Sequence, residues 1–344
     1  MKRISIIGGG RWSRVIADTL LNLQNMTFSI SMYSPSGIES LESWISLDEQ
    51  RKKIKLLKAL SFDKANNNTD AAIVVNRATD HYSTAVSMLD YRIPVLVEKP
   101  IALTGDEVDK LATLAKKNRT FLYASNVFLF QEEFVNFKER VQNSKTVKKI
   151  KLFWTDPVQE IRYGESKTYD ERLNVIDDVI SHVLPMIQSL HEAPMILKDL
   201  DVKLGGACVD ILLVTENAEA DIHLAREADK RQRSIFVETE NETFDFDFAT
   251  EPATLTVQGG EKCETLKLAQ KIRPMRSMLQ VFLDNVENGY IDPRMSPTLA
   301  ANAMHLADKI RPLYLELQGQ WLNDNHLKEM GDGKMYAMRE RGLA

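Results

Sequence analysis

The chain has 344 residues, of which 44% are hydrophobic and 27% charged, and its formal net charge is −5. This composition is typical of a globular protein, and the length predicts about two domains. The slight excess of acidic residues, with no long run of Lys or Arg, argues against a nucleic-acid interface and against a surface for anionic lipid.

The two cysteines, Cys208 and Cys263, are far apart and lie outside any CxxC pattern. The sequence therefore predicts neither a disulfide framework nor a zinc site, and we expect no metal ligands. The apolar run before Gly8 is too short for a signal peptide, and no stretch approaches the roughly 20 apolar residues of a membrane span. We expect a cytoplasmic protein with no nucleic-acid or membrane partner.

A glycine-rich turn follows the first predicted strand (residues 4–7) and precedes a helical stretch. It reads Gly8, Gly9, Gly10, Arg11, Trp12, Ser13. In this context a GxGxxG-like pattern predicts a dinucleotide site. Gly8 would make the tight turn, Gly10 would let the backbone approach a pyrophosphate, and the helix N-terminus would supply N–H groups. Ser13 replaces the third glycine, so the pattern alone also fits a plain strand-to-helix turn.

The second predicted strand, residues 28–33, ends at Ser34-Pro35-Ser36. An acidic residue at this point commonly holds the adenosine ribose, and it would repel a 2′-phosphate. Its absence, together with Ser34 and the nearby Arg11, favours NADP as the cofactor and leaves NAD open. Arg11 fits a solvated loop charge equally well.

Two further predicted strands, residues 71–75 and 95–97, end in polar residues at the same edge of the sheet. Open α/β sheets bind ligands at this carboxyl edge, so we expect cofactor or substrate contacts from Asn76, Arg77, His81, Glu98 and Lys99. Pro100 restricts Lys99 to extended geometry. His81 fits packing against the following helix at least as well as a role in the site.

Strands alternate with helices as far as residue 125, which predicts a doubly wound parallel sheet, with Thr104 capping the helix at 106–117. From residue 148 to 268, alternating runs joined by polar turns predict a mostly antiparallel sheet with one polar face. The predicted fold class is α/β, with a Rossmann domain at 1–125, an α+β domain at 126–317 and a C-terminal extension at 318–344. Helices at 275–288 and 296–315 are expected to close the second domain.

One predicted helix, residues 174–191, interrupts the second domain. Its apolar side chains recur at helical spacing, and Asp178 and His182 are four residues apart on the opposite face. The two side chains therefore point the same way. An isolated pair of this kind also fits a solvated surface pair.

Taken together, the glycine turn, Glu98-Lys99-Pro100 at a strand end and the helix with Asp178 and His182 resemble the Gfo/Idh/MocA family of oxidoreductases. The resemblance runs in order over residues 1–315. It implies that Lys99 is the active-site lysine, that His182 donates or accepts the proton, and that Asp178 helps to bind the substrate. It also implies that the open sheet of the second domain carries the substrate and the contacts of a homodimer or homotetramer.

Chemistry supports these roles. Hydride transfer between a nicotinamide and a C–OH or C–NH carbon moves a proton as well, and an imidazole is suited to shuttle it near neutral pH. An ammonium at Lys99 would stabilise the developing alkoxide, and Asp178 would orient a hydroxyl or the imidazole.

The chain departs from the family pattern at Asn76-Arg77-Ala78, at Asn126-Val127-Phe128-Leu129-Phe130, and at Ser34. Arg77 could bind an anionic group, and Phe128 and Phe130 a less polar one, or these residues could serve only in packing.

The sequence thus predicts an NAD(P)-dependent dehydrogenase or reductase acting on a C–OH, C=O or C=N carbon of a small polar substrate, with a sugar or sugar derivative as the first expectation. Two alternatives stay open: an imine or ketone reductase of a biosynthetic pathway, and a non-catalytic dinucleotide-binding sensor or regulator.

Overall fold

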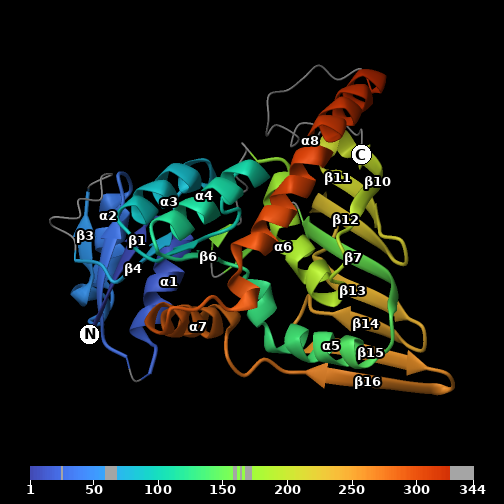
Figure 1. Cartoon of the computed structure of the whole chain (residues 1–344), viewed down its shortest axis with the longest axis horizontal. Helices are drawn as coiled ribbons and strands as arrows, with labels where there is room; N and C mark the ends of the chain where they lie inside the picture. Colours follow the sequence, from blue (N-terminus) through green and yellow to red (C-terminus); the bar gives the residue numbers. More distant parts are fainter. Residues whose placement is uncertain (25, 59–67, 158–160, 163–164, 167–172, 326–344) are drawn as a thin grey trace. The chain divides into compact units, whose positions relative to one another are not determined.

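The computed structural model describes residues 1–24, 26–58, 68–157, 161–162, 165–166 and 173–325 (Figure 1). The chain divides into two compact units. Unit 1 comprises residues 1–130 and 272–304, and unit 2 comprises residues 131–271 and 305–344. Each unit is built on its own large sheet, so each is described by itself.

Unit 1 contains a six-stranded sheet with the order β3-β2-β1-β4-β5-β6, and every neighbouring pair is parallel. The strands are β1 (Lys2–Ile7), β2 (Phe28–Tyr33), β3 (Lys55–Leu57), β4 (Ala71–Val74), β5 (Val95–Val97) and β6 (Leu122–Ala124). This order is that of dinucleotide-binding doubly wound sheets, which confirms the predicted Rossmann architecture. Every residue of β4, β5 and β6 is buried, because helices cover both faces of a parallel sheet.

Helices pack in pairs around this sheet. The pair α3 (His81–Asp90) and α4 (Gly105–Lys117) covers one face, and α1 (Arg11–Leu21) packs with α7 (Pro274–Asn288) on the other (Figure 1). A fifth helix, α2 (Ile38–Ser46), follows β2. The predicted cap of α4 is confirmed, since Thr104 Oγ1 accepts a hydrogen bond from the Glu107 N–H at 3.2 Å.

The helix α7 belongs to unit 1, although the sequence led us to expect it in the second domain. Its apolar face is fully buried there. Phe282 meets Tyr123 edge to face, with ring centroids 5.2 Å apart, and the Ser125 hydroxyl lies 3.7 Å from Met278 Sδ. An apolar helix face does not specify which sheet it covers, so its sequence could not distinguish the two units.

Unit 2 contains an eight-stranded sheet with the order β10-β11-β12-β7-β13-β14-β15-β16. Neighbours are antiparallel except β12 and β7, which confirms the predicted mostly antiparallel sheet. The strands are β7 (Val147–Pro157), β10 (Ile196–Lys203), β11 (Cys208–Val214), β12 (Glu219–Ala228), β13 (Gln232–Thr239), β14 (Thr243–Asp247), β15 (Ala253–Gly259) and β16 (Lys262–Leu268). A further two-stranded sheet joins β8 (Ile161–Arg162) and β9 (Glu165–Ser166). A 3₁₀ turn at Leu204–Gly206 separates β10 from β11.

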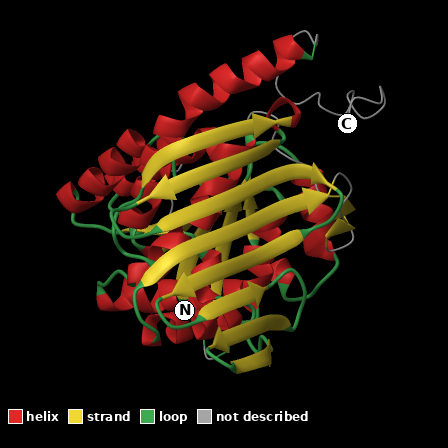
Figure 2. Cartoon of the chain, turned by 90° about the vertical axis from the view of Figure 1, so that its right-hand side faces the viewer, coloured by secondary structure: helices red, strands yellow, loops and turns green. Residues whose placement is uncertain are grey.

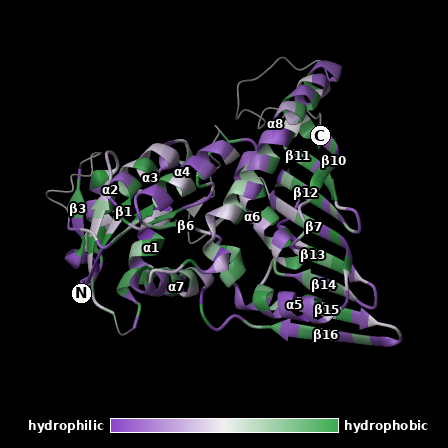
Figure 3. Ribbon diagram, in the orientation of Figure 1, coloured by the Kyte–Doolittle hydropathy of each residue, from purple (hydrophilic) through white to green (hydrophobic). Residues whose placement is uncertain are grey.

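One face of the large sheet packs on helices and the other faces outward. Along β7, Leu152 and Trp154 are buried while Lys151 and Phe153 are half exposed. Figure 3 shows hydrophobic and hydrophilic segments along the strands of this sheet. The covering helices of unit 2 are α5 (Glu132–Asn143), α6 (Val175–Leu190) and most of α8 (Pro297–Asp324). No helix of the described residues lies in front of the strands in Figure 2.

The expected C-terminal extension begins inside a helix. The structure continues α8 to Asp324, and the Tyr314 hydroxyl donates to the Gly206 carbonyl at 3.1 Å, which attaches the helix to the sheet of unit 2. Residues 326–344 of the expected extension lie outside the described residues. Among the helices that the structure describes, none is both long enough and apolar enough to cross a membrane.

Candidate functional site

The glycine turn of unit 1 connects β1 to α1, as predicted. Gly8 has φ +143°, and a Cβ placed on it would lie 2.5 Å from the Val75 carbonyl oxygen. A Cβ on Gly9 would lie 2.2 Å from Ser34 Oγ. Only glycine fits at these two positions, because the turn passes directly over the ends of β2 and β4. Gly9 thus has a steric role that the sequence did not reveal.

Gly10 is the open position of the turn. It is the N-cap of α1 with φ −77°, it provides no side-chain cap, and a Cβ placed on it meets nothing within 4 Å. The space that a side chain would fill lies at the N-terminus of an eleven-residue helix, where N–H groups and the helix dipole favour an anion. These features fit the pyrophosphate of a dinucleotide.

The other residues of the turn divide into buried and exposed. Ser13 is fully buried, and its hydroxyl donates to the Gly10 carbonyl at 2.5 Å, so it permits the close packing that a third glycine would give. The Trp12 side chain is 45% exposed, and the Arg11 guanidinium lies 5.8 Å from its ring centroid. At the end of β2, Ser34 is buried and donates to the Ser36 carbonyl at 2.6 Å.

The edge residues after β4 have different surroundings. Asn76 donates to the Thr84 hydroxyl at 2.9 Å, and Arg77 is exposed. His81 is buried, with Nδ1 2.7 Å from the Pro100 carbonyl oxygen and Nε2 3.2 Å from the Asn76 carbonyl oxygen. Burial lowers the pKa of His81 and outweighs the two carbonyl groups, which raise it. Through its contacts with the carbonyl oxygens of Asn76 and Pro100, the imidazole connects the segments that follow β4 and β5.

Glu98 and Lys99 follow β5 directly. The Ser125 hydroxyl donates to Glu98 Oε1 at 2.6 Å, and the Lys99 N–H donates to Glu98 Oε2 at 3.2 Å. Burial raises the pKa of Glu98, while Ser125 and the Lys99 charge oppose that increase. The Lys99–Pro100 peptide bond is cis. The hydrogen bonds from Ser125 and from the Lys99 N–H hold the Glu98 carboxyl group beside Lys99 at the carboxyl edge of the sheet.

In unit 2, Asp178 lies in the first turns of α6, as predicted from its spacing. Arg226 of β12 donates to Asp178 Oδ2 at 2.9 Å and to the carbonyl oxygens of Leu173 and Asn174 at 2.8 and 3.2 Å. The Asn174 side chain caps the helix by accepting from the Asp177 N–H. Arg226 thus fixes both the carboxylate and the start of the helix.

His182 lies one turn further along α6 and stacks on Trp154 of β7. The ring centroids are 5.4 Å apart and the planes 20° from parallel. The guanidinium of Arg233 lies 3.9 Å from the Trp154 ring centroid, and Arg233 forms a buried ion pair with Asp156. We call these residues the stacking column: Arg233, Trp154 and His182. The column restricts the orientation of the imidazole.

Residues 2–125 match the model of an oxidoreductase family with an NAD-binding Rossmann fold. The match is to the Gfo/Idh/MocA family, and it confirms for residues 2–125 the resemblance seen in the sequence. Human biliverdin reductase A is 27% identical over 161 residues, which are 47% of this chain and 52% of that protein. The chain therefore spans about half the length of this curated relative.

Solved structures of similar fold extend over most of the chain. UDP-N-acetylglucosamine 3-dehydrogenase from Acidithiobacillus ferrooxidans superimposes with a TM-score of 0.76 at 16% identity, covering 92% of this chain and 98% of that one. A 3-ketoreductase from Actinomadura kijaniata, in complex with TDP-benzene and NADP, has a TM-score of 0.75 at 14% identity, covering 90% and 96%. At these identities the likeness establishes the fold.

Sequence reasoning missed the residues that hold Asp178 and His182 of α6. Arg226 contacts Asp178, Trp154 contacts His182, and Arg233 supports Trp154 from behind. The sequence held a signal for the two arginines. Arg226 lies two residues after the inward-facing Leu224, and Arg233 lies two residues before the inward-facing Ile235, so both occupy inward positions of their strands. A charged residue at an inward position predicts a buried partner. The identity of that partner depends on strands far apart in the sequence.

Phe130 and Asn126, where the chain departs from the family pattern, pack within unit 1. Phe130 is buried beneath the Arg294 guanidinium at 4.0 Å, and Asn126 donates to the Arg294 carbonyl at 2.9 Å. These contacts favour the packing alternative for Phe130.

Proposed function

We propose that the chain is an NAD(P)-dependent oxidoreductase that transfers a hydride between nicotinamide and a C–OH or C=O carbon of a small polar substrate, in the first instance a sugar or sugar derivative. The open position at Gly10 carries this proposal, because it leaves room for a phosphate at the N-terminus of α1. The bound cofactor supplies the hydride chemistry at its nicotinamide ring.

The remaining roles belong to side chains of the protein. His182 would move the proton that accompanies hydride transfer, and the ring of Trp154 behind it limits how the imidazole turns. Lys99 would stabilise charge that develops on the substrate oxygen. Asp178, held by Arg226, would orient the substrate. We propose these three residues as the catalytic set.

NADP is the proposed form of the cofactor. Ser34 stands where a carboxylate would repel a 2′-phosphate, and the half-buried Arg14 donates to Ser40 Oγ at 2.6 Å near the start of α2. The 3-ketoreductase of similar fold was solved with NADP. Sugar nucleotides enter the proposal as substrates because one structure of similar fold is named for UDP-N-acetylglucosamine, and the other was solved with the nucleotide TDP-benzene.

The outward face of the unit 2 sheet is the surface that we propose for a homodimer or homotetramer. It carries half-exposed apolar side chains, including Phe153 and Phe236, among charged ones. A mass measurement in solution tests this part. A monomer at micromolar concentration would contradict it.

A pair of glycine variants tests cofactor binding. Gly10→Ala adds a methyl group in the space assigned to the phosphate, and Gly319→Ala adds one where α8 is equally open. Tryptophan fluorescence, to which Trp12 contributes, would be followed during titration with NADPH and with NADH. We expect the wild type and Gly319→Ala to bind NADPH more tightly than NADH, and Gly10→Ala to bind NADPH at least about tenfold more weakly. Equal affinity in all three proteins would contradict the assignment.

A second experiment distinguishes an enzyme from a dinucleotide sensor. Oxidation of NADPH would be followed at fixed protein concentration with keto forms of nucleotide-linked sugars, with free keto sugars and with biliverdin. His182→Gln should reduce turnover at least about 100-fold while leaving NADPH affinity unchanged. Tight NADPH binding without turnover of any of these would favour the sensor. Turnover of biliverdin alone would instead show a reductase of the kind named for the human relative.

A further inference from the structure

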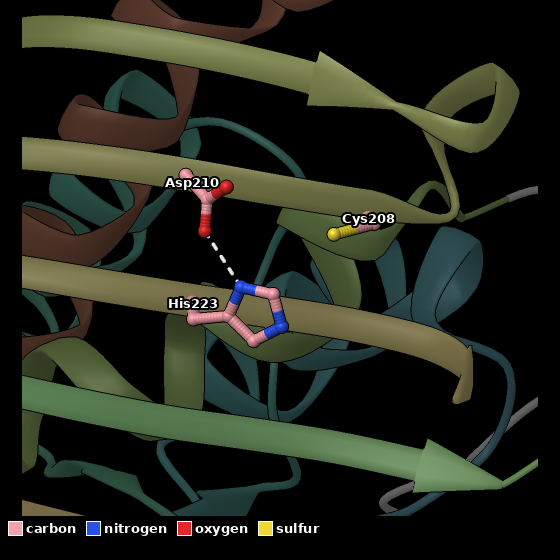
Figure 4. Close-up of side chains that lie close together, drawn as sticks. All are labelled: Cys208, Asp210 and His223. Carbon is pink, nitrogen blue, oxygen red and sulfur yellow. Dashed lines mark hydrogen bonds and ion pairs between the residues drawn. The ribbon is translucent and has the colours of Figure 1, made fainter. Parts of the chain in front are cut away.

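A second group of reactive side chains lies in unit 2, on neighbouring strands of the large sheet. Cys208 and Asp210 are two residues apart in β11, so they share a face, and His223 is directly opposite Asp210 in β12. One candidate ligand atom from each of the three lies within 4.8 Å of the others. Figure 4 shows the three side chains together above the strands. We call this group the Cys208 cluster.

We propose that the Cys208 cluster binds a zinc-class divalent metal ion through the Cys208 thiolate, one Asp210 carboxylate oxygen and the His223 imidazole, with water completing a tetrahedron. Thiolate, imidazole and carboxylate are the ligands that Zn²⁺ takes in proteins. The proposal assigns the cluster a role separate from hydride transfer.

The geometry is close to that of such a site. His223 Nδ1 lies 2.6 Å from Asp210 Oδ1, a hydrogen bond that Figure 4 marks. Ligand atoms about 2.0–2.3 Å from one ion are separated by roughly 3–4 Å. Side-chain movements of about 1 Å would therefore bring the three ligand atoms to these separations. The strands β11 and β12 already hold the three residues in register.

The surrounding charge favours a divalent cation. Lys203 of β10 donates to Asp210 Oδ2 at 2.8 Å and lies 2.9 Å from Asp201 Oδ2. Among the contacts that the structure describes here, two carboxylates thus share one ammonium group. A bound cation would offset the remaining negative charge and that of the thiolate formed when it binds. Lys203 occupies Oδ2, so it orients the carboxylate and leaves Oδ1 toward His223.

Deprotonation of the thiol accompanies binding. Burial raises the pKa of Cys208, and Asp210 adds to that effect while Lys203 opposes it. Without metal the thiol keeps its proton at neutral pH. Metal binding forms a metal–sulfur bond and releases that proton to solvent, with no change of oxidation state.

The metal itself is the probe for the test. Purified protein, treated with a chelator and then dialysed, would be titrated with Co²⁺ alone. We expect one ion per chain, a thiolate-to-cobalt charge-transfer band in the near ultraviolet, and the visible absorption of tetrahedral Co²⁺. Zn²⁺ should displace the signal.

Two ligand variants and one control make the assignment specific. Cys208→Ser should abolish the charge-transfer band, and His223→Gln should weaken Co²⁺ binding at least about tenfold. Cys263→Ser is the matched control, because Cys263 is the exposed second cysteine, and it should bind as the wild type does. Circular dichroism of each variant establishes that it is folded. If Cys208→Ser does not fold, His223→Gln decides the question.

Three outcomes would overturn the proposal: no charge-transfer band in the wild type, undiminished binding in His223→Gln, or loss of the band in Cys263→Ser. The first would show that the cluster is a hydrogen-bonded network only. None of these measurements requires the dinucleotide.

Discussion

The buried pair of Arg233 and Asp156 supports the stacking column, and its removal should be among the costliest single changes in unit 2. The two side chains are only 2% and 5% exposed. Arg233 also donates to the Thr155 carbonyl at 2.6 Å and to the Gln232 carbonyl at 2.8 Å, and its guanidinium covers Trp154. Arg233→Met keeps much of the volume but removes the guanidinium from the buried Asp156 carboxylate.

Breaking a buried ion pair by removing one partner costs about 3–5 kcal/mol, which is the expected loss in the free energy of unfolding of Arg233→Met. Asp156→Leu should also destabilise the protein, because it leaves a buried cation. The double variant replaces the whole pair by apolar side chains. It should be at least about 2 kcal/mol more stable than the sum of the two single losses predicts.

The assay is urea unfolding of the wild type, the three variants and a control, followed by circular dichroism and tryptophan fluorescence. The control is Arg140→Met, which removes an ion pair of unit 2 whose side chains, Arg140 and Glu264, are 44% and 58% exposed. It should cost less than about 0.5 kcal/mol. The reasoning is refuted if Arg233→Met costs less than about 1 kcal/mol, or if the double variant shows no coupling.

Two further predictions concern unit 1. Gly8→Ala should destabilise the protein by at least about 1–3 kcal/mol, because φ +143° is unfavourable for alanine and its Cβ would meet the Val75 carbonyl oxygen. Gly10→Ala should unfold at the same urea concentration as the wild type. Equal unfolding midpoints for the two variants would contradict the assignment of Gly8 as crowded and Gly10 as open. Glu98→Gln tests a pH dependence. Burial raises the pKa of Glu98 in the folded state above 4.5, so in this range the folded state keeps a proton that the unfolded state has lost. Wild-type stability should therefore decline as pH rises from 4.5 to the folded-state pKa. The stability of Glu98→Gln relative to the wild type should therefore increase across that window, whereas parallel stability–pH curves would show that Glu98 is not desolvated.

Much of unit 1 could be predicted because its signals are local. Each of its buried strands is a short apolar run whose residues meet helices on both sides, and the turn from Gly8 to Ser13 adjoins one of them. The carboxyl ends of parallel strands share one edge, so Asn76, Glu98 and Lys99 could be placed together without tertiary information. The spacing of Asp178 and His182 likewise follows from helix geometry alone.

The partners of these residues were decided by the tertiary structure. Arg226 reaches Asp178, and Trp154 reaches His182, only because β12 and β7 are adjacent in the sheet and α6 packs against both. The Cys208 cluster likewise depends on the register that sets His223 opposite Asp210.

Alternation along a strand determines which side chains face inward, and the sequence displays it directly. Which strand lies beside which depends on the burial gained by the whole sheet, a quantity to which residues far apart along the chain contribute together. For the same reason α7 could be recognised as an amphipathic helix from its own residues, while its place on the sheet of unit 1 emerged only from the folded chain.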